Sequence, residues 1–205
     1  MMIKRLLVMV CVLAVLASQA SAYEEGDKPL EFEVGIGTSW GETDGASSGA
    51  GFEFEVGGKV GYFFSNIVGV MGGATLDYFS TPYSWSGSGY SLDVDVSAIC
   101  LTLPAGVYVS PSGGLIFGGG FSLSIPLINL TDANDSYGSA NGNDVVKLQP
   151  FFNFYIDAGY DFGESLGKGI KLLLRYSKSL SDISPDGYLS KDFLHLMIGY
   201  SYITY

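Results

Sequence analysis

The stretch Gly51-Phe-Glu-Phe-Glu-Val-Gly-Gly-Lys-Val-Gly-Tyr62 decides the fold. Large apolar side chains occupy every second position from Phe52, and charged residues or glycines occupy the positions between them. A period of two predicts a β-strand with one apolar and one polar face. In a soluble sandwich the apolar face would enter a protein core. In a membrane barrel it would face lipid and the charges would face the barrel interior.

The first 22 residues have the pattern of a secretory signal peptide. Lys4 and Arg5 precede an apolar run, and Ala20-Ser21-Ala22 forms an A-x-A cleavage site. The alternative, an uncleaved membrane anchor, needs about 20 apolar residues, more than this run supplies. We therefore expect a signal peptide at 1–22 and a single outer-membrane β-barrel domain at 23–205. Removal of the signal leaves Cys100 alone, which excludes an intramolecular disulfide.

The alternation of the opening stretch recurs along the chain and predicts eight strands in all. The predicted strands are 30–40, 51–62, 67–79, 92–109, one between residues 114 and 129, 145–162, 170–180 and 191–205. The connections at 41–49, 80–91, 129–144 and 181–190 are long, whereas those at 63–66, 110–114 and 163–169 are short. This alternation of long and short connections is typical of an up-and-down barrel with long exterior loops. The predicted fold class is an all-β, eight-stranded antiparallel up-and-down transmembrane β-barrel.

The fourth predicted strand leaves two alternatives open. Its apolar side chains occupy even positions from Leu92 to Ala98 but odd positions from Ile99 to Val109. This shift predicts either a β-bulge near Ala98 to Cys100 or an upper half of the strand that rises clear of the bilayer.

The polar faces predict a salt-bridged barrel interior. Eight strands enclose space for side chains only, and unpaired buried charge is costly, so opposite charges should be balanced there. The predicted interior charges are Glu33, Glu53, Glu55, Asp77 and Asp157 against Lys59, Lys147, Lys171 and Arg175. Aromatic residues near strand ends predict interface girdles, namely Trp40, Tyr62, Phe63, Tyr78, Phe79, Tyr108, Tyr160 and Tyr202.

Several segments resemble those of small eight-stranded outer-membrane barrels of the OmpX and OmpA-transmembrane-domain kind, the outer membrane protein β-barrel domain group. They are Leu-Thr-Leu-Pro at 101–104, Ser-Pro-Ser-Gly-Gly at 110–114, Leu-Ile-Phe-Gly-Gly-Gly at 115–120, Ile-Asp-Ala-Gly-Tyr at 156–160, Leu-Leu-Arg-Tyr-Ser at 173–177 and Ile-Gly-Tyr-Ser-Tyr at 198–202. The resemblance covers about residues 30–202 and implies a fold, not an activity. It also implies that a C-terminal aromatic, Tyr202 or Tyr205, marks the last strand for the barrel-insertion machinery.

These patterns favour a non-enzymatic integral outer-membrane protein with a structural or surface-exposed role, either envelope integrity or adhesion through exterior loops. A small-solute channel is the first alternative. A lipid A-modifying enzyme is the second, because some barrels of this size are deacylases or palmitoyltransferases. An acyl-transfer site needs a base beside a nucleophile. His195 is the single histidine, and no motif selects a serine for it.

The exterior loops and the composition predict the partners. Tyr83, Trp85, Tyr90 and Tyr137 are the candidate loop contacts for a surface ligand, which the sequence does not identify. Asp and Asn residues between 132 and 144 could hold Ca²⁺, but they also form ordinary loops, so we expect no metal and no cofactor. The formal net charge of −11 disfavours nucleic acid. We expect a monomer in outer-membrane lipid.

Overall fold

The computed structural model describes residues 24–42, 46–87, 90–111, 114–135, 138–140, 146–162, 169–185 and 189–204. The predicted signal segment at 1–22 lies outside the described residues. Within the described part of the chain, no helix is long and apolar enough to cross a membrane.

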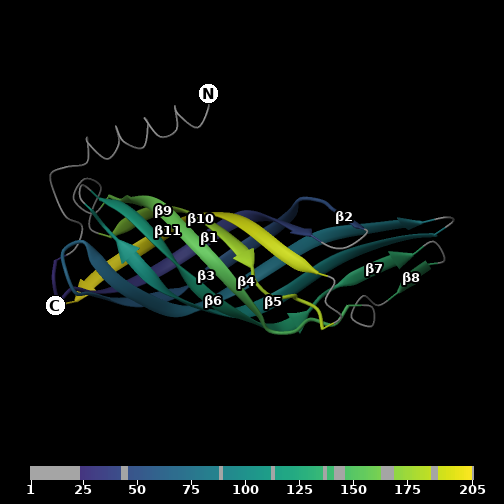
Figure 1. Cartoon of the computed structure of the whole chain (residues 1–205), viewed down its shortest axis with the longest axis horizontal. Helices are drawn as coiled ribbons and strands as arrows, with labels where there is room; N and C mark the ends of the chain where they lie inside the picture. The colour runs from purple at the N-terminus through teal and green to yellow at the C-terminus, as the bar shows by residue number, and fades with distance from the viewer. Residues whose placement is uncertain are drawn as a thin grey trace, which may run out of the picture.

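Eight long antiparallel strands form a closed barrel (Figure 1). Its strands, in order around the barrel, are β1 (Lys28–Glu42), β3 (Gly51–Phe63), β4 (Val68–Gly87), β5 (Tyr90–Val109), β6 (Leu115–Asn129), β9 (Phe151–Asp161), β10 (Ile170–Ser179) and β11 (Ser190–Thr204). β1 pairs with β11 over its whole length, and this pairing closes the barrel. Every other neighbour in the barrel is adjacent along the chain, so the predicted eight-stranded up-and-down fold is confirmed.

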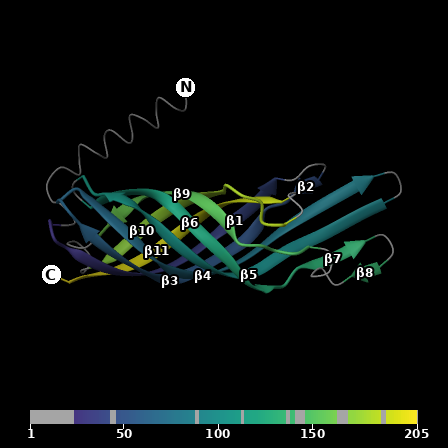
Figure 2. The same cartoon turned by 60° about the horizontal axis from the view of Figure 1, so that its bottom comes forward.

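One hairpin extends well beyond the barrel. The connection predicted at 80–91 is largely strand, because β4 continues to Gly87 and β5 already begins at Tyr90. Three short strands join it: β2 (Ala46–Ser48) pairs with β4, β7 (Asp132–Asp135) pairs with β5, and β8 (Gly138–Ala140) pairs with β7. We call residues 46–48, 80–87, 90–97, 132–135 and 138–140 the sheet extension. Figure 2 shows its long strands reaching away from the C-terminus.

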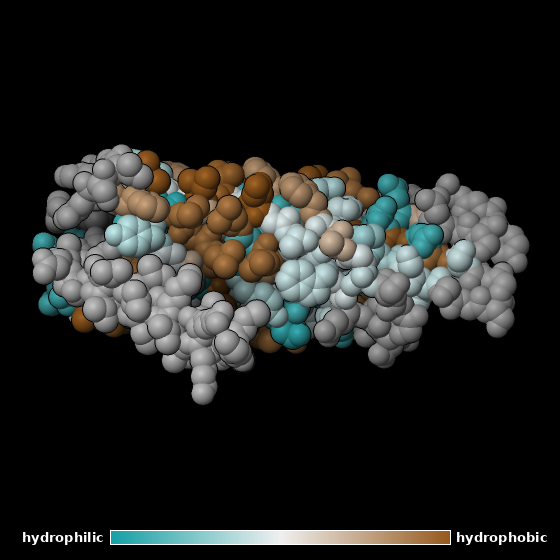
Figure 3. Space-filling view, turned by 90° about the horizontal axis from the view of Figure 1, so that it is seen from above, coloured by the Kyte–Doolittle hydropathy of each residue, from teal (hydrophilic) through white to brown (hydrophobic). Residues whose placement is uncertain are grey.

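The two faces of the barrel wall have opposite polarity. On β3 the outward side chains Phe52, Phe54, Val56, Val60 and Tyr62 are 37–61% exposed. Glu53, Glu55 and Lys59 on the inner face are at most 3% exposed. Figure 3 shows hydrophobic side chains gathered over the barrel and mostly polar ones toward the extension. The barrel is therefore apolar outside and charged inside, as the membrane-barrel interpretation of the opening stretch predicts.

The alternation of β5 never shifts. Val94, Val96, Ala98, Cys100 and then Thr102 all face inward, and the pairing of β5 with β4 keeps one register throughout. An irregularity does occur between Ile99 and Cys100 in the pairing with β6, where Leu127 is the extra residue of β6. A bulge is thus present at the predicted level but on the neighbouring strand. The apparent change of phase in β5 is a change of polarity along the strand.

In the sheet extension, polarity is the reverse of that in the barrel. The inner face carries Tyr83, Val94 and Ala133, each at most 2% exposed. The outer face carries polar residues that are exposed, namely Ser84, Asp93, Asp95 and Asp132. The extension therefore has the pattern of a sheet in water, and the barrel has the pattern of a sheet in lipid.

Candidate functional site: the barrel interior and the sheet extension

Arg175 on β10 is the centre of the charged interior. Its Nε and Nη2 donate to the two oxygens of Asp157 on β9, at 2.8 and 2.9 Å. Its Nη1 donates to Oε1 of Glu55 on β3, at 2.9 Å. The Tyr108 hydroxyl donates to Oδ2 of Asp157 at 2.7 Å. One guanidinium thus joins strands from opposite parts of the barrel wall, with charge-assisted bonds that hold its fork in place.

Three lysines form further ion pairs in the interior. Lys59 lies 2.6 Å from Oε1 of Glu33, and Lys191 lies 3.0 Å from Oε1 of Glu53. Lys171 pairs with Glu31. Glu31 and Lys191 are missing from the predicted set, although each lies on the inward face of its strand. Both already lie within the predicted strands 30–40 and 191–205, where the same alternation turns them inward.

His195 on β11 lies between two carboxylates. Its Nδ1 is 3.2 Å from Oε2 of Glu55, and its Nε2 is 3.3 Å from Oε2 of Glu53. Gly37 faces it across the β1–β11 pairing, and a Cβ at Gly37 would clash with the imidazole ring. The ring is fully buried, and each of its two nitrogens lies beside a carboxylate.

Eight of the nine predicted interior charges lie inside the barrel. Glu33, Glu53, Glu55, Lys59, Asp77, Asp157, Lys171 and Arg175 are buried inside the barrel. The prediction was wrong for Lys147, which is exposed and precedes β9 in the non-strand segment 146–150. The alternation was extended too far there, because β9 begins only at Phe151.

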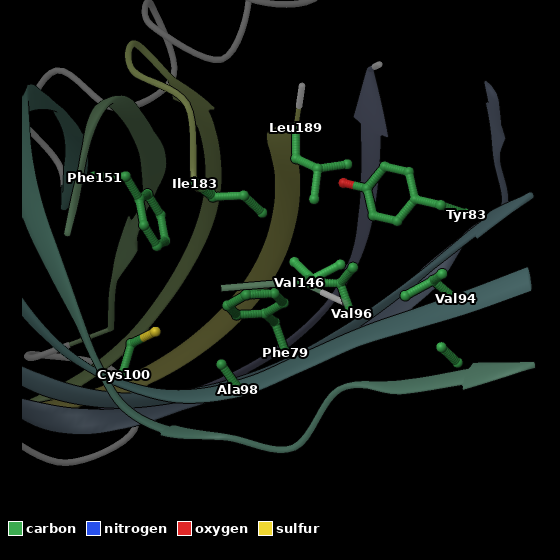
Figure 4. Packing of buried hydrophobic residues seen from close by; sticks show 11 residues of the cluster. Phe79, Tyr83, Val94, Val96, Ala98, Cys100, Val146, Phe151, Ile183 and Leu189 are labelled. Atoms are coloured by element: carbon green, nitrogen blue, oxygen red, sulfur yellow. The ribbon is translucent and has the colours of Figure 1, made fainter. Parts of the chain in front are cut away.

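An apolar cluster fills the extension end of the interior (Figure 4). Side chains of β4 and β5 pack there against residues that lie between strands, such as Val146, Ile183 and Leu189. The buried members are Phe79, Tyr83, Val94, Val96, Ala98, Cys100, Ala133, Val146, Phe151, Ile183 and Leu189. The Ile183 amide donates to the Leu189 carbonyl at 2.9 Å, and the Gln149 side chain donates to the carbonyls of Asp182 and Ser184. These bonds hold the segment from Asp182 to Ser184 in place.

A second apolar cluster lies toward the opposite end, where the short connections are. It consists of Phe63, Met71, Tyr108, Ile116, Leu173 and Met197. The interior therefore has charged groups bounded by apolar side chains toward both ends. Phe63, Phe79 and Tyr108, predicted as girdle residues, belong to these clusters, so that prediction was wrong for them. Their parity turns them inward, and Phe79 lies in the middle of β4 and not at its end.

The structure changes the list of candidate loop contacts. Tyr83 is 1% exposed and its hydroxyl donates to the Ser190 carbonyl at 3.0 Å, so it is a core residue and not a loop contact. Burial, together with the charge of Asp192, raises the pKa of this hydroxyl. Trp85 stacks on Tyr83 at 5.9 Å between ring centroids and is partly buried. The side chain of Tyr90 and the whole of Tyr137 lie outside the described residues.

Among the described residues, no group of three or more His, Cys, Asp or Glu side chains could hold a metal ion. Of the acids in the considered Ca²⁺ segment, Asp132 is exposed on the outer face of the extension. The remaining side chains of that segment lie outside the described part, as do the side chains of Tyr202 and Tyr205.

No protein-family model matches the chain, and no curated protein matches its sequence. Among solved structures, it is similar to the attachment invasion locus protein Ail of Yersinia pestis, with 18% identity, a TM-score of 0.47 and coverage of 87% of this chain and 99% of Ail. OprG, an outer membrane protein of Pseudomonas aeruginosa, has 13% identity, a TM-score of 0.47 and coverage of 90% and 99%. Neisserial surface protein A has 11% identity, a TM-score of 0.44 and coverage of 84% and 97%. These likenesses to small eight-stranded outer-membrane barrels carry no argument about function.

Proposed function

We propose that the chain is an integral outer-membrane barrel that neither catalyses a reaction nor conducts solutes, and that it presents the sheet extension on the cell exterior. The observation that carries this proposal is the inverted polarity of a closed wall. From Phe52 to Tyr62, β3 rises about 26 Å, at about 3.4 Å per residue and a tilt of about 40°, which matches an apolar band of about 25 Å. Closure supports it too, because lipid cannot satisfy open strand edges.

The contacts in the interior favour a barrel that does not conduct, in preference to a channel. Arg175, Glu55 and Asp157 bridge the interior, and apolar clusters lie toward both ends. A solute would have to displace buried ion pairs, and breaking one such pair costs about 3–5 kcal/mol. For catalysis, His195 would need a free nitrogen beside a nucleophile, whereas both nitrogens face Glu53 and Glu55.

The reversed polarity of the extension supports a surface role. Its polar outer face suits water, and its inner face is filled by the cluster that also covers the barrel opening. A sheet that stands above the bilayer is suited to contact with a surface ligand or a neighbouring protein. The role is thus adhesion or envelope stabilisation, with the extension as the contacting element.

Two measurements test this proposal. The purified full chain should migrate differently on a detergent gel before and after boiling, and it should show no stable conductance steps in a planar bilayer. Identical migration of boiled and unboiled protein would contradict the closed barrel. Steady single-channel conductance by the wild type would contradict the non-conducting assignment, and it would favour the small-solute channel.

A further inference from the structure

The charged and neutral groups of the barrel interior are unevenly distributed. Lysine, arginine and histidine side chains reach inward from β3, β10 and β11. The inner faces of β5 and β6 instead carry hydroxyls, such as Thr102 and Ser124, whose oxygens are 2.7 Å apart. Asp77 on β4 lies between these two regions and is 8% exposed. This acid therefore borders the part of the wall that offers neutral oxygen atoms.

Asp77 differs from the other inward-facing acids named above because it has no basic partner. Glu31, Glu33, Glu53, Glu55 and Asp157 each pair with a lysine, with Arg175 or with His195. None of the ion pairs within the described ranges includes Asp77. The charged groups that act on its carboxylate are those of Glu55 and Glu53, which have the same sign.

Within the described part of the chain, two polar atoms at this position make no hydrogen bond of ordinary geometry. They are Oδ1 of Asp77 itself and the hydroxyl of Thr75, a residue that is 1% exposed. Thr75 lies directly opposite Thr102 in the β4–β5 pairing, and Asp77 is two residues further along the same face of β4. The hydroxyls of Thr75 and Thr102 are close enough to the Asp77 carboxylate to act on it as weak hydrogen-bond donors, although neither makes a hydrogen bond of ordinary geometry to it. Three inward-facing oxygen donors therefore lie together.

A buried carboxylate without a counter-charge is costly, so either a proton or a bound cation must neutralise it. Carboxylate and hydroxyl oxygens are ligands for hard cations. One carboxylate with neutral hydroxyls supplies a single negative charge, which a monovalent ion balances and a divalent ion exceeds. We propose that Asp77, Thr75 and Thr102 bind one small monovalent cation of the sodium class inside the barrel. This site does not depend on the surface role of the extension.

The test measures the thermal unfolding midpoint of the full chain, refolded in detergent in sodium chloride or in N-methyl-D-glucamine chloride at equal ionic strength. Above the dissociation constant, each tenfold increase in Na⁺ should raise the wild-type midpoint by about 3 to 6 °C. Asp77→Asn should lose this increase, because it removes the negative charge. Asp95→Asn is the matched control, because Asp95 is exposed on the outer face of the extension. It should respond to Na⁺ as the wild type does.

Thr75→Ser keeps an oxygen donor and should keep the response to Na⁺, whereas Thr75→Val should weaken it. This pair provides a test if Asp77→Asn fails to fold. A wild-type midpoint that is independent of Na⁺ would overturn the proposal and would favour a proton as the neutralising group. A response to Ca²⁺ in the absence of any response to Na⁺ would overturn the monovalent assignment.

Discussion

At the scale of single residues, Arg175 makes the largest set of ionic contacts described in the interior. Its guanidinium lies within 4 Å of Glu33, Glu55 and Asp157, and all four side chains are at most 5% exposed. In water such pairs contribute little, because solvent screens them. In the interior, each charge has lost its hydration and depends on its partner. Removing one member therefore leaves the others without compensation.

We predict that Arg175→Met lowers the free energy of unfolding by about 3–5 kcal/mol, because Glu55 and Asp157 remain buried without their main partner. Urea unfolding in lipid vesicles, followed by tryptophan fluorescence, measures the change. Lys178→Met is the matched control. Lys178 pairs with Asp192 at 3.4 Å but its side chain is 48% exposed, so its loss should cost less than about 1 kcal/mol. Equal losses in both variants would contradict a buried network.

At the scale of the element, β5 has two environments on one unbroken alternation. In the extension, its even positions enter the apolar cluster, as Val96 does. In the barrel, its even positions enter the polar interior, as Thr102 does. Its odd positions face outward, from the exposed Asp93 and Asp95 to the apolar Leu103 and Val107. The backbone of β5 is continuous from the extension into the barrel. The polarity of its outward side chains therefore follows the surroundings, water at the extension and lipid at the barrel.

Adjacent substitutions in β5 test this assignment. We predict that Val96→Asp costs roughly 3 kcal/mol or more, because it buries a carboxylate in an apolar cluster. Asp95→Val should change stability by about 0.5 kcal/mol or less, since it removes one of two acids that face each other across the β5–β7 pairing, Asp95 and Asp132. The same urea measurement applies. A larger loss from Asp95→Val than from Val96→Asp would place the opposite face inside.

At the scale of the whole molecule, the barrel and the extension depend on different pairings. The pairing of β1 with β11 closes the barrel. The β4–β5 hairpin contributes residues 68–79 and 98–109 to the barrel wall. The extension adds β2, β7 and β8 to the remainder of that hairpin. Its inner face contributes Tyr83 and Val94 to the cluster over the barrel opening. The barrel wall should therefore persist without the extension.

We predict that a chain in which Asn-Gly replaces residues 82–95 still forms a closed barrel. Thr81 and Val96 are paired in the native hairpin, and a two-residue Asn-Gly connection suits that geometry. The shortened protein should retain the mobility difference between boiled and unboiled samples, with a lower unfolding midpoint. Deletion of residues 190–204 is the contrasting variant. It removes β11 and the closure with β1, so no folded band should remain.

How far the sequence predicts the fold can be judged from particular residues. The faces of Phe54, Glu53 and Arg175 follow from a period of two, which needs no knowledge of the partner strand. The same rule does not hold outside a strand, as at Lys147, because β9 begins only at Phe151. It also failed at Tyr83, where a segment rich in serine and glycine indicated a loop, but cross-strand pairing with β5 makes a strand.

The sequence alone determined the eight strands, their alternation and the inversion of polarity, because side-chain direction along a strand is a local property. Only the tertiary structure decided which charges meet, that the β4–β5 hairpin continues beyond the barrel, and that Asp77 has no basic partner. Arg175 and Glu55 are 120 residues apart in the chain. Their contact depends on closure of the whole sheet, and no local pattern encodes the distance across a barrel.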